Sequence, residues 1–295
     1  MQVKKNGKRR EIQHYRCKVC GKQYQSKRRK QNFDNKLWRA YAWGRQTLVE
    51  LAHLHRRSKR WIRKRLDCAV CVSHKFSPRS VVIVADTVFH KHKFGVCVFR
   101  AAHFKRNLCW AVTDREHSAV YRDCRLKLEQ HGFELIGAVI DGKPGLFEVF
   151  RDIPVQMCHF HQIAIISRYL TRRPKLEAGQ ELRMLTLTLP YTIEEKFSAG
   201  LHQWYKKWEP FLKEKTFNLG TKRWFYTHKP LRSAYRSLRT NLPLLFTCLR
   251  YPELNMPNTT NCLDGIFAHL KDKLRIHRGL KLHRKVKLIN EILSK

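Results

Sequence analysis

Three aspartates in this chain have surroundings that suit divalent-metal chemistry. Asp86 and Asp141 follow the apolar runs VVIVA and IGAVI, and Asp264 follows the polar run NTTNCL. Carboxylate oxygens are the ligands that Mg²⁺ and Mn²⁺ prefer, and two such ions about 3.5–4 Å apart assist attack on a phosphodiester. With 23 Asp and Glu against 61 Lys and Arg, each acid so placed is a candidate ligand.

Each of these aspartates also has a purely structural interpretation. Asp86 and Asp141 could be solvated residues at strand ends. Asn261 and Asp264 have the spacing of a helix capping box, and a carboxylate in the first turn complements the helix dipole. However, the helix expected after Asp264 carries an apolar stripe, which places Asp264 beside a buried face, so we favour metal binding. The stripe consists of Leu263, Phe267, Leu270 and Leu274.

The first two aspartates lie in a stretch whose pattern predicts one mixed sheet. Three apolar runs, SVVIVADT, KFGVCVFRA and NLCWAVTD, predict strands that end at or near Asp86, Ala101 and Asp114. A helix (AVYRDCRLKLEQHG), a strand ending in Asp141, a short helix (GLFEVF) and a fifth strand (PVQMCHF) follow. This is the order of an RNase H-like sheet, in which Asp86 and Asp141 would meet at neighbouring strand ends.

Two cysteine motifs suggest metal sites. Cys17 and Cys20, followed by Gly21, match half of a zinc ribbon. A second Cys-x-x-Cys pair, at residues 68 and 71 with a histidine at 74, could complete it across a helical region. Cys158 and His161 could also bind zinc, but two ligands do not make a site, so they indicate nucleic-acid contact or packing beside the active centre.

Residues 34–67 have helical spacing, and TLVELAHLHRRSKRWIRKRL predicts two helices joined by a turn at Arg57 and Ser58. This is the layout of a helix-turn-helix whose second helix enters a major groove. The alternative is an ordinary helical hairpin with a solvated basic face. The DNA-contacting candidates are Lys59, Arg60, Arg63, Lys64 and Arg65.

The net charge of +38 and pI near 10.3 indicate a polyanionic partner, of which nucleic acid is the leading candidate. With 43% hydrophobic residues in 295, the chain can fold into several modules. No long apolar run or signal peptide is present, so we expect no membrane partner and a cytoplasmic, nucleoid-associated bacterial protein with largely reduced cysteines.

The chain resembles the mutator-type transposases of bacterial insertion sequences, in the variant with an N-terminal zinc ribbon. The matching motifs are RCKVCGK, VIVAD, VIDGKPGLF, CHFH and NTTNCLDGIFAHLKDKLRIHRGL. The resemblance implies an RNase H-like DDE/DDD catalytic domain with an all-helical insertion between the second and third acids. It implies Asp86, Asp141 and Asp264 as the metal triad, and Cys158 with His161 as the family's Cys-two-residue-His signature.

The chain departs from that family in two places. The family usually has Glu where this chain has Asp264, and a side chain shorter by one methylene would slow catalysis, since about 1 Å of misplacement can cost on the order of a hundredfold in rate. The ribbon also lacks its first Cys pair, which leads us to expect a start that is either truncated or misassigned.

We therefore expect a transposase that binds double-stranded DNA as a homo-oligomer and uses two Mg²⁺ or Mn²⁺ ions, with zinc as a further candidate, for strand cleavage and transfer. The alternatives are a catalytically impaired DNA-binding derivative and an RNase H-like nuclease. The expected organisation is a basic zinc-ribbon remnant at 1–33, a helix-turn-helix region at 34–75, the first part of the catalytic core at 80–162, an all-helical insertion at 163–255, and the core's C-terminal helix with a basic tail at 256–295.

Overall fold

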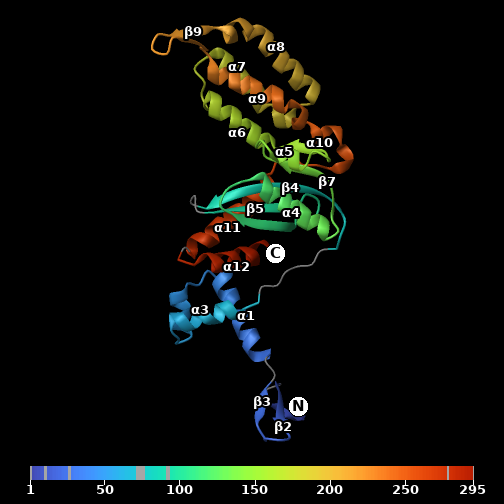
Figure 1. Cartoon of the computed structure of the whole chain (residues 1–295), viewed down its shortest axis with the longest axis vertical. Helices are drawn as coiled ribbons and strands as arrows, with labels where there is room; N and C mark the ends of the chain where they lie inside the picture. The colour runs from blue at the N-terminus through green and yellow to red at the C-terminus, as the bar shows by residue number, and fades with distance from the viewer. Residues whose placement is uncertain are drawn as a thin grey trace. The chain divides into compact units, whose positions relative to one another are not determined.

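The computed structural model describes residues 2–9, 12–25, 28–70, 77–90, 94–277 and 279–294, with side chains of 28–32 excepted (Figure 1). The chain divides into two compact units, one made of Lys75–Ala268 and the other of Met1–His74 together with His269–Lys295. The residues at 71 and 74, which we expected to extend the second cysteine motif, lie outside the described residues. Each unit has its own core.

The larger unit is built on a five-stranded mixed sheet with the order β6-β5-β4-β7-β8. The first three strands in that order pair antiparallel, whereas β4–β7 and β7–β8 are parallel. The predicted strands are thereby confirmed, and the mixed α/β arrangement is consistent with an RNase H-like fold. The strands are β4 (Ser80–His90), β5 (Phe94–Ala101), β6 (Asn107–Thr113), β7 (Glu134–Ile140) and β8 (Val155–Met157).

One face of this sheet is covered by helix α4 (Ser118–Gln130), which packs on β5, β6 and β7. The helix buries Tyr121, Cys124 and Leu128, at a spacing that puts them on one side. Below them, Val81 to Ala85 are all buried. A strand buried on both faces has no polar alternation, which explains the run VVIVA. A short helix, α5 (Leu146–Val149), closes the end of the same core.

Strand β4 does not end at Asp86, as we predicted, but continues to His90. The buried part of the strand does end at Ala85, one residue before Asp86. Strand β7 pairs with β4 only as far as Val84 opposite Val139, and beyond that point the antiparallel neighbour β5 alone extends the pairing. Asp86 thus lies where the parallel neighbour stops, and the sequence marks that point by a change from apolar to polar residues.

A helical insertion follows β8 and has its own core, formed by residues such as Leu182, Phe197, Trp204 and Leu238. Its long helices α6, α7, α8 and α9 lie side by side (Figure 1). The elements are α6 (His159–Leu170), α7 (Glu177–Leu187), η1 (Leu189–Tyr191), α8 (Glu194–Lys213), β9 (Lys215–Asn218), β10 (Arg223–Tyr226), α9 (Lys229–Leu245), α10 (Thr247–Arg250) and η2 (Pro252–Leu254).

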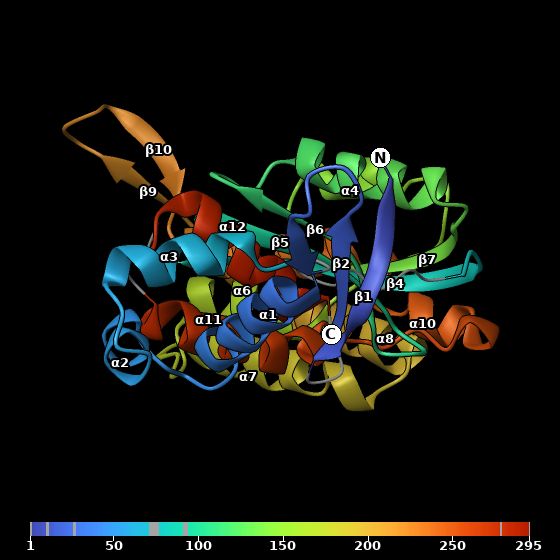
Figure 2. The same cartoon turned by 90° about the horizontal axis from the view of Figure 1, so that it is seen from below.

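The prediction of an all-helical insertion is wrong at one place, the antiparallel hairpin of β9 and β10, which projects from the helices in Figure 2. The segment KTFNLGTKRWFY is rich in Thr and aromatic residues, which favour strands, and a turn containing Gly220 separates its halves. The rings of Phe217 and Trp224 contact each other across the hairpin in a tilted arrangement, with centroids 5.2 Å apart. In the sequence, the strand pattern of this segment is too short to stand out from the helical patterns on both sides of it.

The insertion is tied to the sheet where it returns, through strand β8. The fully buried side chain of Gln156 donates to the Leu245 carbonyl (2.8 Å) and accepts from the Cys248 N–H (2.9 Å). The Thr247 hydroxyl donates to the Val155 carbonyl at 2.7 Å. The C-terminal end of α9 is therefore anchored to the sheet by buried hydrogen bonds.

The smaller unit combines an N-terminal sheet with helices from both ends of the chain. Helix α3 packs on α1 and α2, and α1 also packs on α12. The Lys287 ammonium donates to the carbonyls of Leu66 and Ala69 (both 2.6 Å), and Arg284 pairs with Asp67 at 2.7 Å. No helix among the residues with described structure is long and apolar enough to cross a membrane. The elements are β1 (Val3–Arg9), β2 (Ile12–Cys17), β3 (Gln23–Gln25), α1 (Arg28–Ala42), α2 (Leu48–Leu54), α3 (Lys59–Cys68) and α12 (Leu282–Leu293).

Replacing Gln156 by Leu should lower the free energy of unfolding by about 2–4 kcal/mol, because the buried Cys248 N–H would lose its acceptor and the Leu245 carbonyl one of its donors. Urea unfolding followed by tryptophan fluorescence measures this change. The matched control is Gln203→Leu on the exposed face of α8, which should change stability by less than about 0.5 kcal/mol. Equal effects of the two substitutions would contradict the anchoring role.

Candidate active site

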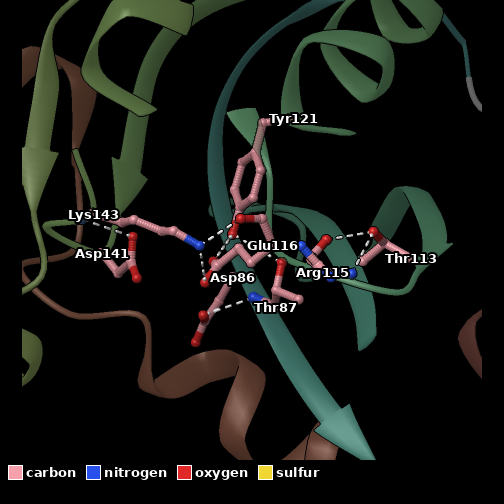
Figure 3. Close-up of polar contacts among 8 residues, drawn as sticks. All are labelled: Asp86, Thr87, Thr113, Arg115, Glu116, Tyr121, Asp141 and Lys143. Carbon is pink, nitrogen blue, oxygen red and sulfur yellow. Dashed lines mark hydrogen bonds and ion pairs between the residues drawn. The ribbon is translucent and has the colours of Figure 1, made fainter. Parts of the chain in front are cut away.

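The register of the central strands brings Asp86 and Asp141 together. Val84 lies opposite Val139 in the parallel pairing of β4 and β7. Two residues further along come Asp86, still in β4, and Asp141, the first residue after β7. A step of two along extended chain returns a side chain to the same face. The charge of Asp141 acts on Asp86, and the close-up in Figure 3 draws both side chains. The predicted meeting of these two acids is present in the structure.

Glu116 is a third acid at this place, and the sequence patterns do not single it out because it lies in the loop between β6 and α4. The predicted strand-end acid of β6, Asp114, is exposed. Glu116 instead turns inward, where its carboxylate accepts from the Tyr121 hydroxyl (2.9 Å) and pairs with the Lys143 ammonium (3.1 Å) (Figure 3). The only feature of the sequence that could have indicated Glu116 is its position as a second acid, two residues after Asp114.

Burial and neighbouring carboxylates raise the pKa values of the two strand acids. Burial raises the pKa of Asp86 to about 6, and the charges of Asp141 and Glu116 add to the increase. Burial, followed by the charge of Glu116, also raises the pKa of Asp141. Backbone N–H groups oppose the shifts, with Thr87 donating to Asp86 at 2.7 Å and Lys143 to Asp141 at 3.2 Å. A bound cation would offset the cost of keeping these carboxylates ionised.

Cys158 and His161 lie at the start of α6, on the side of the acids. A hydrogen bond with Cys158, reinforced by the charges of Asp86 and Asp141, raises the pKa of His161 to about 9 despite burial. Burial raises the pKa of Cys158, but hydrogen bonds from His161 and Thr260 outweigh it, so the net shift is downward. Cys158 is fully buried, so the nucleic-acid contact predicted for it would require the surrounding chain to open.

Asp264 is the exposed first residue of helix α11 (Asp264–Ile276), which follows the 3₁₀ turn η3 (Asn261–Leu263). The helix therefore begins at Asp264 itself, whereas a capping box would need it at the third helical position. The predicted apolar stripe is confirmed, since all four of its residues are buried.

The segment before Asp264 is attached to the site, although Asp264 is not joined to the acid pair. The Thr260 N–H and hydroxyl both donate to the Cys158 sulfur, at 3.3 and 3.5 Å. The charges that shift the pKa of Asp86 come from His161, Asp141 and Glu116. A role for Asp264 as the third ligand stays a prediction.

The acid pair suits a magnesium-like ion, although no three His, Cys, Asp or Glu side chains in the part of the chain with described structure converge closely enough to hold a metal ion. Mg²⁺ is commonly held by one or two carboxylates together with substrate phosphates and water. Asp86 and Asp141 supply that number of carboxylates, and a bound cation would favour their ionised forms, which burial disfavours.

A cleft of about 830 Å³ opens beside the acids. One wall of the cleft includes Glu116, Asp141 and Lys143, and the second wall is formed by residues of α6 and α9. The size falls in the range of roughly 300–1,000 Å³ that is common for ligand sites. The residues of the second wall are His161, Ile165, Arg168, Tyr169, Ser233, Arg236, Ser237, Thr240 and Asn241.

The smaller unit contains the other two predicted sites. Cys17 ends β2, and Gly21, with φ of 68°, donates its N–H to the Cys17 carbonyl at 3.0 Å, which forms a tight turn around Cys20. Hydrogen bonds from the N–H groups of Cys20 and Val19 lower the pKa of Cys17. This suits a thiolate ligand, but across the described ranges no third ligand joins the two cysteines.

Helix α3 begins at Lys59 after the cap residue Ser58, whose hydroxyl accepts from the Trp61 N–H. Its apolar side buries Ile62 and Leu66. Arg65 is directed to the buried Asp34, with an ion-pair distance of 2.6 Å. The remaining four predicted DNA-contacting side chains are exposed: Lys59, Arg60, Arg63 and Lys64.

The Asp86→Asn variant should be more stable than the wild type at pH 7 without divalent ions. A carboxyl whose pKa is raised from 3.8 to about 6 on folding binds more protons in the folded state, so stability falls as pH rises through that window. The difference should reach about 3 kcal/mol at most above pH 6 and vanish below about pH 4. Denaturant unfolding between pH 4 and 8 measures it. The exposed Asp123→Asn is the control, and a stability difference that does not change with pH would contradict the raised pKa of Asp86.

Mg²⁺ or Mn²⁺ should raise the unfolding temperature of the wild type. A ligand present at 100 times its Kd stabilises the folded state by about 2.7 kcal/mol. The gain should be lost in Asp86→Asn and Asp141→Asn and kept in Asp123→Asn, as thermal unfolding with and without EDTA would reveal. An equal gain in all four proteins would mean that the ions bind elsewhere.

The solved structures to which this chain is similar include a transposase complex and a viral intasome. The Drosophila P element transposase strand transfer complex aligns at 11% identity and a TM-score of 0.32, covering 88% of this chain and 78% of that one. A chain of the simian T-cell lymphotropic virus intasome in complex with a PP2A regulatory subunit aligns at 11% identity and a TM-score of 0.23, covering 53% and 69%. Similarities this low carry no weight for the activity. No family model and no curated protein matches the chain.

Proposed function

We propose that the protein is a DNA transposase that binds transposon ends and catalyses metal-dependent strand cleavage and strand transfer. The observation that carries this proposal is the pair of partly buried carboxylates, Asp86 and Asp141, at neighbouring parallel strands, with Asp141 lining an open cleft. The net charge of +38 supports a nucleic-acid substrate over a small anion. A homo-oligomer is part of the proposal because two DNA ends must be held together.

Asp86 and Asp141 would hold the divalent ions, which activate the attacking oxygen and stabilise the leaving oxygen when bound. The remaining groups of the site serve the DNA. His161, with a pKa of about 9, is an imidazolium at neutral pH and can donate to a non-bridging phosphate oxygen. The Thr87 and Lys143 N–H groups fix one oxygen of each aspartate, which leaves the other oxygen of each for the ions.

The Glu116 carboxylate acts on the site through its neighbours. It accepts from Tyr121 and pairs with the Lys143 ammonium, and in this way it holds the lysine beside the acids. An incoming phosphate would compete with Glu116 for that ammonium. Lys143 is then the positive group that exchanges a carboxylate partner for a phosphate as DNA enters the cleft.

The finer features of the proposal concern the family and the DNA-reading elements. A mutator-type bacterial insertion-sequence transposase would use α2 and α3 as a helix-turn-helix, with the exposed basic side of α3 toward the major groove. Cys17 and Cys20 would contribute half of a zinc site in the N-terminal sheet. Asp264 would become the third metal ligand when its helix moves toward the acid pair.

A second candidate function, a DNA-binding protein with impaired catalysis, is favoured by one observation. Asp264 is exposed, and within the described parts of the chain no group of three ligands is assembled. A protein of this kind would bind the transposon ends and leave them uncut. The two candidates differ in metal-dependent cleavage and agree in DNA binding.

Cleavage of DNA carrying the inverted repeats that flank the coding sequence distinguishes these candidates. With Mg²⁺ or Mn²⁺ the wild type should cut at the repeat ends, and Asp141→Asn should be at least about a hundredfold slower because it removes a carboxylate from the ion site. Asp123→Asn should cleave at the wild-type rate. If the wild type binds the repeats but cuts no faster than Asp141→Asn, catalysis is ruled out and the second candidate stands.

A further inference from the structure

The second wall of the cleft presents one polar face that the metal chemistry does not require. On α9 the wall residues Ser233, Arg236, Ser237 and Thr240 recur every three or four positions, which places them on one side of the helix. The opposite side of α9 is buried in the core of the insertion. The polar face is therefore directed to the cleft by the same amphipathic pattern that packs the helix.

The wall is held in place by a buried amide. Gln162 of α6 is fully buried, and its carboxamide donates to the Ser237 hydroxyl (3.2 Å) and accepts from the Asn241 side chain (2.8 Å). Both partners line the cleft. One side chain thereby fixes the α6 and α9 parts of the wall relative to each other, so the wall is a preformed surface.

The charges of the cleft are separated by side. Its two acids, Glu116 and Asp141, lie on the sheet side, whereas the helical wall carries Arg168 and Arg236, both exposed. The basic character continues along α9, because Arg236 also lines a neighbouring cavity of about 150 Å³ with Arg232 and Arg239. This spacing follows one side of the helix and suits a chain of phosphates that leaves the acid site along α9.

An aromatic ring completes the wall. Tyr169 lies next to Arg168 at the end of α6, lines the cleft and is 43% exposed. An exposed ring beside a cation is a stacking platform for a base, and stacking requires a base whose face is not covered by its neighbour in a duplex. The cleft volume of about 830 Å³ is also that of a small-ligand site.

We propose that the face of α6 and α9 lining the cleft binds an unpaired nucleotide next to the scissile phosphate. Arg168 and Arg236 bind its phosphates, Tyr169 stacks on its base, and Ser233 and Thr240 hydrogen-bond its sugar or base edge. The position next to the scissile phosphate rests on the proposed transposase function, whereas the binding of an unpaired nucleotide does not. DNA that enters this site is locally melted on the protein.

The test compares a fluorescent duplex bearing a 3′ single-stranded tail with the same duplex made blunt, by fluorescence anisotropy in EDTA at several salt concentrations. Arg168→Ala and Arg236→Ala should each weaken binding of the tailed duplex about tenfold, and the slope of log affinity against log salt should fall by about 0.7 for each phosphate that the variant no longer neutralises. Tyr169→Ala should weaken it at least about fivefold with an unchanged slope, and Tyr169→Phe should bind like the wild type.

Matched controls lie on exposed helical surface elsewhere in the same unit. Arg122→Ala on α4 and Tyr191→Ala in η1 should bind both duplexes as the wild type does. The side chains of Arg122 and Tyr191 do not line the cleft, whereas those of Arg168, Arg236 and Tyr169 do. Unchanged thermal midpoints show that each variant is folded.

The outcomes separate this inference from the proposed function. Equal losses for tailed and blunt duplexes, or losses in the controls as large as in the wall variants, would overturn the inference. If the wall variants lose tailed-duplex binding while the wild type fails to cleave with metal, the nucleotide site stands and the transposase function does not. If the wild type cleaves with metal and the wall variants bind the tailed duplex normally, the transposase function stands and the nucleotide site does not.

Discussion

The parallel pairing of β4 with β7 is the constraint on which the rest of the site depends. It brings two carboxylates to a partly buried sheet edge. Burial there raises the pKa values of both, and the charge of Glu116 adds to the increase. Several neighbours oppose this increase: the N–H groups of Thr87 and Lys143 donate to the acids, and the His161 imidazolium faces them. The fold thus keeps negative charge where an apolar core alone would exclude it.

Strand β8 is the second organising element, although it is only three residues long. Helix α6 begins directly after it, so that His161 faces the acids, and Gln156 binds the end of α9 where the insertion returns. The segment that leads to Asp264 also docks here, because the His159 N–H donates to the Asn258 carbonyl at 2.9 Å. Three separate parts of the chain therefore obtain their positions from one edge strand.

The sequence predicted the parts of the site that local patterns encode. Apolar runs marked the strands of the sheet, and their polar ends marked Asp86 and Asp141. Glu116 was not predicted because a loop residue has no periodicity. Its inward direction depends on contacts with Tyr121 and Lys143, which no local sequence pattern indicates.

Long-range contacts also explain why residues 269–295 belong with the N-terminal unit. Lys287 binds carbonyls at the end of α3, across more than 200 positions of sequence, and no pattern within the tail indicates such a partner. The hairpin of β9 and β10 was hidden for a different reason, since four-residue strands between long helices are too short to show a clear alternation. Metal binding by Cys17, Cys20 and Asp264 stays a prediction.

If the protein binds DNA as proposed, the anchoring of α9 at two places has a consequence for which DNA sequences it prefers. Gln162 holds the middle of the helix and Gln156 its C-terminal end, both by buried amide hydrogen bonds. A wall fixed in this way would adapt little to its ligand. The distortion would then fall on the DNA, and the energy required would depend on the sequence being distorted. Flexible steps such as TA and CA/TG unstack most readily. The rigidity of the insertion would then favour some cleavage sites over others without any contact to a base edge.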